Sequence, residues 1–183
     1  MKTQLHKALL QKQKINSIKN AIFILMMAIC SNINAQSNNN IIDNKVDCDP
    51  SLWKHVYNKE RLEIQPQGCI TVKGVVKGFR PANDKSTEPD GDKHILLKLD
   101  KGQEGLLNEK NISNEDGCLV IEPVCINSTP TQEDAKAACK DYVNTIYIPK
   151  VGEHVSVTGC YVHDTQHGHM EIHPVTKIVK LNK

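Results

Sequence analysis

A short segment near the end of the chain carries most of its candidate ligand chemistry. Residues 163–176 read H-D-T-Q-H-G-H-M-E-I-H-P-V-T and hold four of the chain's eight histidines. Imidazole nitrogens and carboxylate oxygens are ligands that zinc and related divalent ions prefer. In an extended strand alternate side chains share one face, so His169, Glu171 and His173 are predicted to point together. The segment therefore predicts a divalent-metal site, with zinc or another divalent metal as the cofactor.

The predicted metal site has a first set of ligands and two second candidates. The first set consists of His167, His169, Glu171 and His173. The second candidates, His94 and Asp164, can complete the set or orient it from adjoining strands. A competing interpretation is a solvated strand face without a metal, in which a backbone contact holds His173 before Pro174. The solvated face is the favoured interpretation, because such faces are common without a metal.

An acidic residue, Glu122, interrupts the apolar stretch C-L-V-I-E-P-V-C-I at residues 118–126. A buried carboxylate needs a partner, and His94 or His173 would supply one. A Glu–His pair of this kind can act as a general acid/base. It can equally be a hydrogen bond that locks the last strand to the third, which is the favoured interpretation. Glu122 and Glu171 are the candidate catalytic bases.

Three aspartates, Asp90, Asp92 and Asp100, flank an Asp-Gly turn and the strand after it. Their oxygens could hold calcium or magnesium. An Asp-Gly pair is typical of a turn, so a turn is the favoured interpretation.

The first 35 residues have the pattern of an export signal. A lysine-bearing start is followed by the nine-residue apolar run 21–29 and a polar tail that ends at Ala35. The apolar run is too short to span a bilayer, although an uncleaved anchor is an alternative. The pattern predicts a periplasmic or secreted protein that begins at Gln36 and has no membrane span after cleavage.

The positive net charge of the chain comes from its predicted export signal. The whole chain has a net charge of +2, but five of its basic residues and none of its acidic ones lie in residues 1–35. The remainder carries 18 basic and 21 acidic residues, a net charge of −3. It also offers few stacking aromatics, so nucleic acid is an unlikely partner. An oligosaccharide, a peptide or a protein is compatible with the composition.

Six cysteines follow residue 35, and an even number in an exported chain favours disulfides over a zinc cluster. The preferred pairing is Cys125–Cys139, Cys69–Cys160 and Cys48–Cys118. The alternative is that one or two cysteines stay free and buried.

The hydrophobic pattern of the remainder predicts five strands and two helices. A first helix is predicted over about 52–62, opened by Asp49, and a second over about 132–143. The strands are predicted at residues 68–79, 93–100, 118–126, 153–163 and 170–181, and the first of them should bend at a glycine.

Five strands with a helix between the third and the fourth is the order of an OB-fold, a small Greek-key barrel. The predicted fold class is therefore all-β with short helices, and an irregular β-sandwich is the alternative. The predicted organisation is a signal peptide at 1–35, a flexible linker at 36–47, and an OB-fold-like domain with an N-terminal helix at 48–183.

Several stretches resemble a family of exported bacterial OB-fold-like domains of uncharacterised function. They include the strand C-I-T-V-K-G-V-V at residues 69–76, the turn at 90–92, and the closing motif His-Gly-x-x-Glu-Ile-His-Pro at 167–174. The resemblance covers roughly Cys69–Val179 and implies a fold without an established activity. His169 stands where the family would have an aromatic residue.

The sequence thus predicts an exported, disulfide-stabilised binding or interaction module with an unknown ligand, which binds a divalent metal through its His/Glu strand face. A metal-dependent hydrolase that uses the same cluster is the alternative. The two differ in geometry, because an enzyme needs an open coordination position in a concave pocket.

Overall fold

The computed structural model describes residues 47–80, 87–127 and 129–182. The predicted signal peptide at 1–35 and residues 36–46 of the predicted linker lie outside the described residues. The described residues all fall in one unit, Lys45–Lys183. Among them, no helix is long and apolar enough to cross a membrane.

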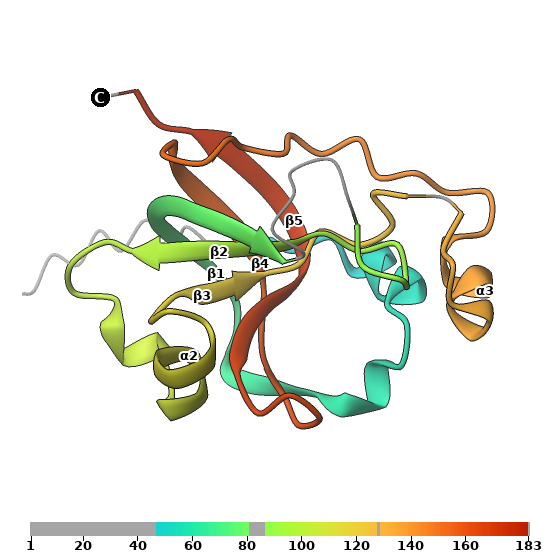
Figure 1. Cartoon of the computed structure of the whole chain (residues 1–183), viewed down its shortest axis with the longest axis horizontal. Coiled ribbons are helices and arrows are strands. Elements are labelled where there is room, and N and C mark those ends of the chain that lie inside the picture. The colour runs from blue at the N-terminus through green and yellow to red at the C-terminus, as the bar shows by residue number, and fades with distance from the viewer. Residues whose placement is uncertain (1–46, 81–86, 128, 183) are drawn as a thin grey trace, which may run out of the picture. The chain divides into compact units, whose positions relative to one another are not determined.

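Five strands form the frame of the domain (Figure 1). They are β1 (Leu62–Arg80), β2 (His94–Leu99), β3 (Leu119–Ile121), β4 (His154–Asp164) and β5 (Met170–Lys180). β1 pairs with both β2 and β4, while β5 pairs antiparallel with β4 and parallel with β3. The hydrogen-bonded order β1-β2-β3-β5-β4 therefore closes on itself. The prediction of a mostly β domain with five strands is confirmed.

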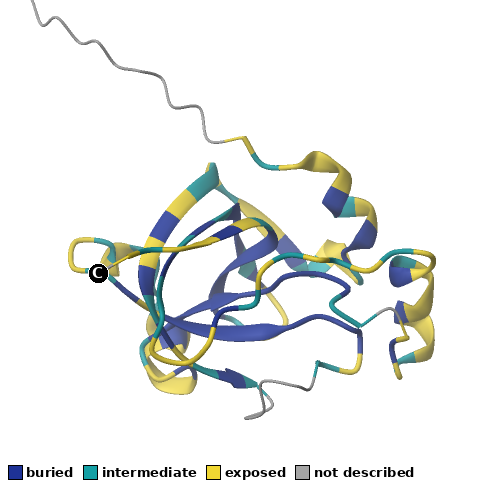
Figure 2. Cartoon of the chain, turned by 90° about the horizontal axis from the view of Figure 1, so that it is seen from above, coloured by how far each residue is buried: buried dark blue, intermediate teal, exposed yellow. Residues whose placement is uncertain are grey.

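Alternation along the strands separates an inner core from an outer face. The inner cluster contains Ile95, Leu97 and Leu99 of β2, and Met170 and Ile172 of β5. These are the residues that the period of two predicts to point inward. The intervening residues of both strands lie on the outer face, and Figure 2 shows that the central strands are buried along most of their length.

The long first strand bends where glycines permit it. Its register shifts between Ile64 and Cys69 in the pairing with β4, and between Val76 and Gly78 in the pairing with β2. Gly74 is required for a different reason, because a Cβ there would lie 2.3 Å from the carbonyl oxygen of Lys98. The predicted bend of this strand at a glycine is confirmed.

A second apolar cluster packs against the outer face. It contains Leu52, Val56, Leu62, Val124, Cys125, Cys139, Cys160 and Val162. The short helices that contribute to it or lie beside it are η1 (Pro50–His55), η2 (Lys59–Arg61), η4 (Glu133–Ala135) and α3 (Lys136–Cys139). In Figure 1, α3 lies at the right of the view and α2 (Glu109–Asn114) at the lower left, below β3.

The prediction of a single helix over 52–62 is wrong. The predicted cap is present, since Asp49 accepts a hydrogen bond of 2.8 Å from the Ser51 N–H. The chain nevertheless leaves the helical conformation at Val56, and Asn58 adopts a left-handed φ of 49°. Two 3-10 helices result in place of one α-helix.

Other predicted boundaries also need correction. The helix predicted over 132–143 ends at Cys139, because the chain turns at Asp141 with a φ of 58°. The strand predicted over 118–126 is paired only over Leu119–Ile121. It stops before Pro123, which has no N–H to donate to a partner strand.

One helix was missed by the sequence interpretation. The long connection between β2 and β3 contains η3 (Glu104–Leu106) and then α2, and neither is among the two helices predicted from the sequence. Asn108 caps α2, and Asn111 completes a capping box. The missed signal was this Asn-x-x-Asn pattern, in which an amide replaces the usual acid of a capping box.

The disulfide prediction is confirmed for one pair and wrong for two. Cys125–Cys139 forms as predicted, but Cys48 bonds to Cys69. Cys118 and Cys160 are free and buried, which is the predicted alternative. Cys160 does lie opposite Cys69 in the register of β1 and β4, but the N-terminal segment brings Cys48 to the same cysteine.

Loss of the Cys125–Cys139 bond should destabilise the domain. The bond closes a loop with a sequence separation of 14 residues, and a loop of this size predicts a loss of about 3 kcal/mol in the free energy of unfolding. We expect this loss in Cys125→Ala/Cys139→Ala, measured by denaturant unfolding without reductant. The matched control is Cys118→Ala/Cys160→Ala, which removes two buried thiols and no cross-link. An equal loss in both variants would contradict the prediction.

Candidate metal-binding pocket

The outer face of β5 is buried rather than solvated. The exposed fractions of His169, Glu171 and His173 are 4%, 0% and 1%. The chain after β3 lies along this strand, since Glu122 exchanges backbone hydrogen bonds with Ile172 and Val175. The interpretation of these residues as a wet polar face is therefore wrong, and their charges must be balanced inside the protein.

A chain of hydrogen bonds and ion pairs joins three histidines through two carboxylates. Glu171 lies between His169 and His173, with oxygen-to-nitrogen distances of 3.2 and 3.1 Å. Glu122 lies 2.9 Å from Nδ1 of His173 and 3.2 Å from Nδ1 of His94. The predicted partners of Glu122 are confirmed, and this residue links the end of β3 to β2 and β5.

The electrostatics of these pairs oppose the effect of burial. Burial disfavours the charged imidazole of His94, but Glu115, Glu122 and Glu88 outweigh it and raise the pKa of His94 to about 12. Burial likewise disfavours the Glu122 carboxylate, yet hydrogen bonds from His173 and His94 hold its pKa well below the ordinary value. In the metal-free protein the imidazoles therefore carry protons that balance the buried carboxylates.

The histidine cluster opens to solvent through a pocket of about 420 Å³. Its wall is formed by Arg80, Glu88, His94, Asn114, Glu115, Gln166, His167 and His169. A larger cavity of about 650 Å³ lies around residues 129–141 and is lined by no histidine. We take the smaller pocket as the candidate site, because it is lined by three imidazoles and two carboxylates.

One group in the pocket wall has the composition of a metal site. Ligand atoms of Asp164, His167 and His169 all lie within 4.8 Å of one another. Oδ1 of Asp164 accepts hydrogen bonds from the N–H groups of Gln166 and His167, while Oδ2 lies 3.0 Å from Nδ1 of His167. Because Nε2 of His169 faces Glu171, its Nδ1 is left for a ligand. A carboxylate behind a ligating imidazole is the usual outer support of a metal site.

The turn between β4 and β5 positions these side chains, and α2 holds the turn. Gly168 takes a left-handed φ of 81°, and its carbonyl accepts a hydrogen bond of 2.8 Å from the Asn108 side chain. Asn111 is fully buried and binds both the N–H and the carbonyl of Met170, at 2.8 and 2.9 Å. The helix that the sequence interpretation missed therefore fixes the start of β5 beside the pocket.

The structure sorts the predicted ligands into two layers. His167 and His169 lie in the pocket wall, and Asp164, which had been a second candidate, is fully buried beside them. Glu171 and His173 lie behind the wall, buried and hydrogen-bonded to each other. They are therefore supports of the site rather than its open ligands.

Two carboxylates of the pocket were not found from the sequence. Glu88 lies 3.3 Å from Nδ1 of His94, and Glu115 lies 3.5 Å from Nε2 of the same ring. Glu88 stands in a polar loop and Glu115 follows α2, so neither shares a strand pattern with the histidines. Only the packing of these segments around His94 brings them together.

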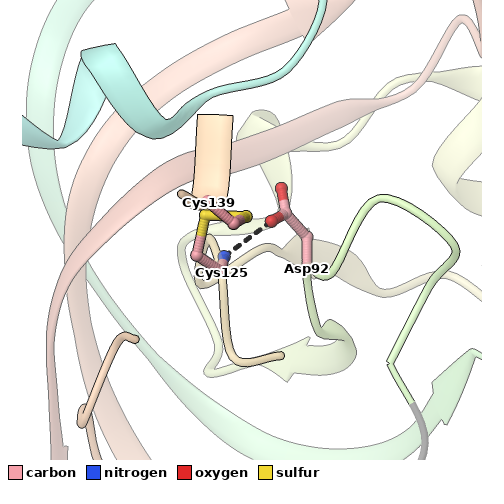
Figure 3. Close-up of side chains that lie close together, drawn as sticks. All are labelled: Asp92, Cys125 and Cys139. Carbon is pink, nitrogen blue, oxygen red and sulfur yellow. Dashed lines mark hydrogen bonds between the residues drawn. A yellow bond between two sulfur atoms is a disulfide. The ribbon is translucent and has the colours of Figure 1, made fainter. Parts of the chain in front are cut away.

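The aspartates of the Asp-Gly turn form no common cation site. Asp90 accepts a hydrogen bond from the Asp92 N–H, which is turn chemistry as favoured from the sequence. Asp100 instead pairs with His154, at 2.8 Å. Figure 3 shows Asp92 beside Cys125 and Cys139. The two sulfurs are bonded to each other, and Asp92 accepts a hydrogen bond of 2.7 Å from the Cys125 N–H. This arrangement fixes the turn and offers no thiolate to a metal.

Comparison of the chain with protein-family models, with curated proteins and with solved structures gave no match. The likeness of the closing motif to exported bacterial OB-fold-like domains stays a prediction.

The raised pKa of His94 predicts how the stability of the metal-free protein depends on pH. The pKa is about 12 in the fold against an ordinary 6.5, so the charge on His94 stabilises the fold fully below pH 6.5 and this contribution is lost as the pH rises. The measurement is urea denaturation in the presence of a chelator. Between about pH 6.5 and about pH 9, we expect the free energy of unfolding to fall less with rising pH in His94→Gln than in wild type.

The control for this pH dependence is His163→Gln. His163 also faces a carboxylate, Glu63 at 3.4 Å, but its side chain is 31% exposed. This variant should keep the wild-type slope. Equal slopes in wild type and His94→Gln would refute the prediction.

Proposed function

We propose that this protein is a divalent-metal-binding module in which Asp164, His167 and His169 hold the ion at the wall of the pocket. The observation that carries the proposal is that ligand atoms of these three residues lie within 4.8 Å of one another, where His167 and His169 line a concave, solvent-connected pocket. Their side chains are 0%, 48% and 5% exposed, so the site is buried on one side and open on the other. An open position of this kind can take a water molecule or a ligand group.

The ligand types favour zinc. Two imidazoles and one carboxylate form a ligand set that zinc sites with an open position use, and other transition metals such as iron also accept it. One carboxylate oxygen of Asp164 is fixed by two backbone N–H groups, and the other, which would bind the ion, lies 3.0 Å from Nδ1 of His167. Arg61 is the competing cation, with its Nε 3.2 Å from that second oxygen.

We further infer an OB-fold-like barrel in an exported protein. The closed strand order, with a short helix between β3 and β4, supports the OB-fold. Two disulfides support an oxidising compartment, the periplasm or the cell exterior. Oligosaccharide, peptide and protein ligands are all compatible with a pocket of this polarity.

A metal-dependent hydrolase is the second candidate, and the concave pocket favours it. The bases expected from the sequence are unsuited to the role, because Glu122 and Glu171 are buried and each binds two imidazoles. Glu88 replaces them as the candidate base, since its side chain is 25% exposed and lines the pocket. Hydrolysis of model esters by the zinc-loaded protein, lost in Glu88→Gln, would identify an enzyme.

Removal of the pocket histidines should abolish zinc binding at this site. We expect His167→Ala/His169→Ala to weaken zinc binding by more than about 100-fold, because changes behind the ligands alone cost about 10- to 100-fold. The measurement is zinc titration of the metal-free protein, with the metal content of the purified protein read by plasma mass spectrometry.

The matched control is His154→Ala/His163→Ala. It removes two histidines near the ends of β4, where they pair with Asp100 and Glu63 outside the pocket. It should bind zinc as wild type does. No zinc binding to wild type, or an equal loss in both double variants, would refute the proposed function.

A further inference from the structure

The wall of the pocket carries a third imidazole, that of His94, with the same kind of support as His169. His94 is 8% exposed and faces buried Glu122 through Nδ1. Its other nitrogen, Nε2, points to Glu115 at 3.5 Å. His169 repeats the arrangement, with Nε2 on buried Glu171 and Nδ1 3.7 Å from Glu115. Each ring thus has one nitrogen fixed by a buried carboxylate and the other turned to the same pocket carboxylate.

The distance of 3.5 Å between Nε2 of His94 and Oε2 of Glu115 is too long for a good hydrogen bond. Nε2 of His94 and Oε2 of Glu115 are both buried, and neither has a hydrogen-bond partner among the described residues. Burial of a polar atom without a partner destabilises a fold. The two atoms form an unsatisfied, buried pair within residues that line a solvent-connected pocket.

A separation of 3.5 Å does suit two ligands of one divalent ion. Zinc binds imidazole nitrogen and carboxylate oxygen at roughly 2.0–2.2 Å, and two such ligands at a tetrahedral ion lie roughly 3.3–3.6 Å apart. The second oxygen of Glu115 lies 3.7 Å from Nδ1 of His169, close to the same spacing. Glu115 therefore offers one oxygen to each imidazole.

We propose that the pocket holds two divalent ions, the second bound by His94 and Glu115, with Glu115 bridging it to the ion at Asp164, His167 and His169. This inference rests on the proposed function for its first ion. The rings of His94 and His169 have centroids 5.9 Å apart, and the paired ions of two-metal sites are separated by about 3.5–4 Å. Water fills the remaining positions of the second ion, as is usual where the protein supplies few ligands.

Charged neighbours of the second position come from three elements. Glu88 and Glu122 face the opposite nitrogen of His94. Arg80 is the nearest competing cation, with its Nε 3.8 Å from Oε2 of Glu115, and it also pairs with Asp116 at 3.1 Å. Its guanidinium can stay with Asp116 when an ion binds Glu115, because the Arg80 side chain is 41% exposed.

The test is the number of ions that the metal-free full chain binds. Titration with Zn²⁺ should give two equivalents for wild type and one for His94→Gln, whose remaining ion keeps its affinity within a few-fold. His167→Ala should lose the other ion. Glu63→Gln, a change of an exposed carboxylate outside the pocket, should keep two equivalents.

The bridge is tested with Glu115→Gln. This variant should weaken the second ion by at least about 10-fold. Loaded with Mn²⁺, wild type should show the broadened electron paramagnetic resonance signal of a coupled pair, and Glu115→Gln should show the signal of isolated ions. Far-UV circular dichroism checks that each variant folds. If one of Glu115→Gln and His94→Gln does not fold, the other still tests the second ion.

The outcomes separate the two proposals. One equivalent in wild type, unchanged in His94→Gln and lost in His167→Ala, would overturn the second ion and leave the proposed function standing. One equivalent lost in His94→Gln and kept in His167→Ala would overturn the Asp164/His167/His169 site. No bound ion in wild type would overturn both.

Discussion

The balance of buried charge is the constraint on which this structure depends. Glu122 and Glu171 are 3% and 0% exposed, and neither could be buried as a lone carboxylate. Imidazoles from β2 and β5 lie against them and supply positive charge through their protons. Glu122 follows β3 and binds imidazoles of β2 and β5. The charge pairing and the strand order therefore stabilise each other.

The same pairing orients the pocket. Each buried carboxylate fixes one nitrogen of an imidazole and directs the other toward Glu115, so a network that stabilises the fold also prepares ligand atoms. In the metal-free state protons satisfy the carboxylates, and metal ions at the outer nitrogens would take over part of that role. Stability and metal binding are therefore coupled through pH, because ligation requires a deprotonated nitrogen.

The pocket also depends on helix α2, whose residues Glu109–Asn114 include none of the proposed ligands. Asn108 and Asn111 of the α2 cap bind the turn at Gly168 and the backbone of Met170. Glu115 follows directly after this helix and so reaches the space between His94 and His169. A change in the cap of α2 would therefore displace both the turn and the pocket carboxylate.

The sequence by itself determined the five strands, the inward and outward faces of β2 and β5, the Cys125–Cys139 bond and the histidine-rich segment. These follow from local rules, the period of two along a strand and the spacing of residues close in the chain. Tertiary structure alone decided that the His/Glu face is buried, that Cys48 bonds to Cys69, and that Glu88 and Glu115 meet His94. These contacts join segments whose separation in the chain carries no periodic signal, so only the packing of the whole domain selects them.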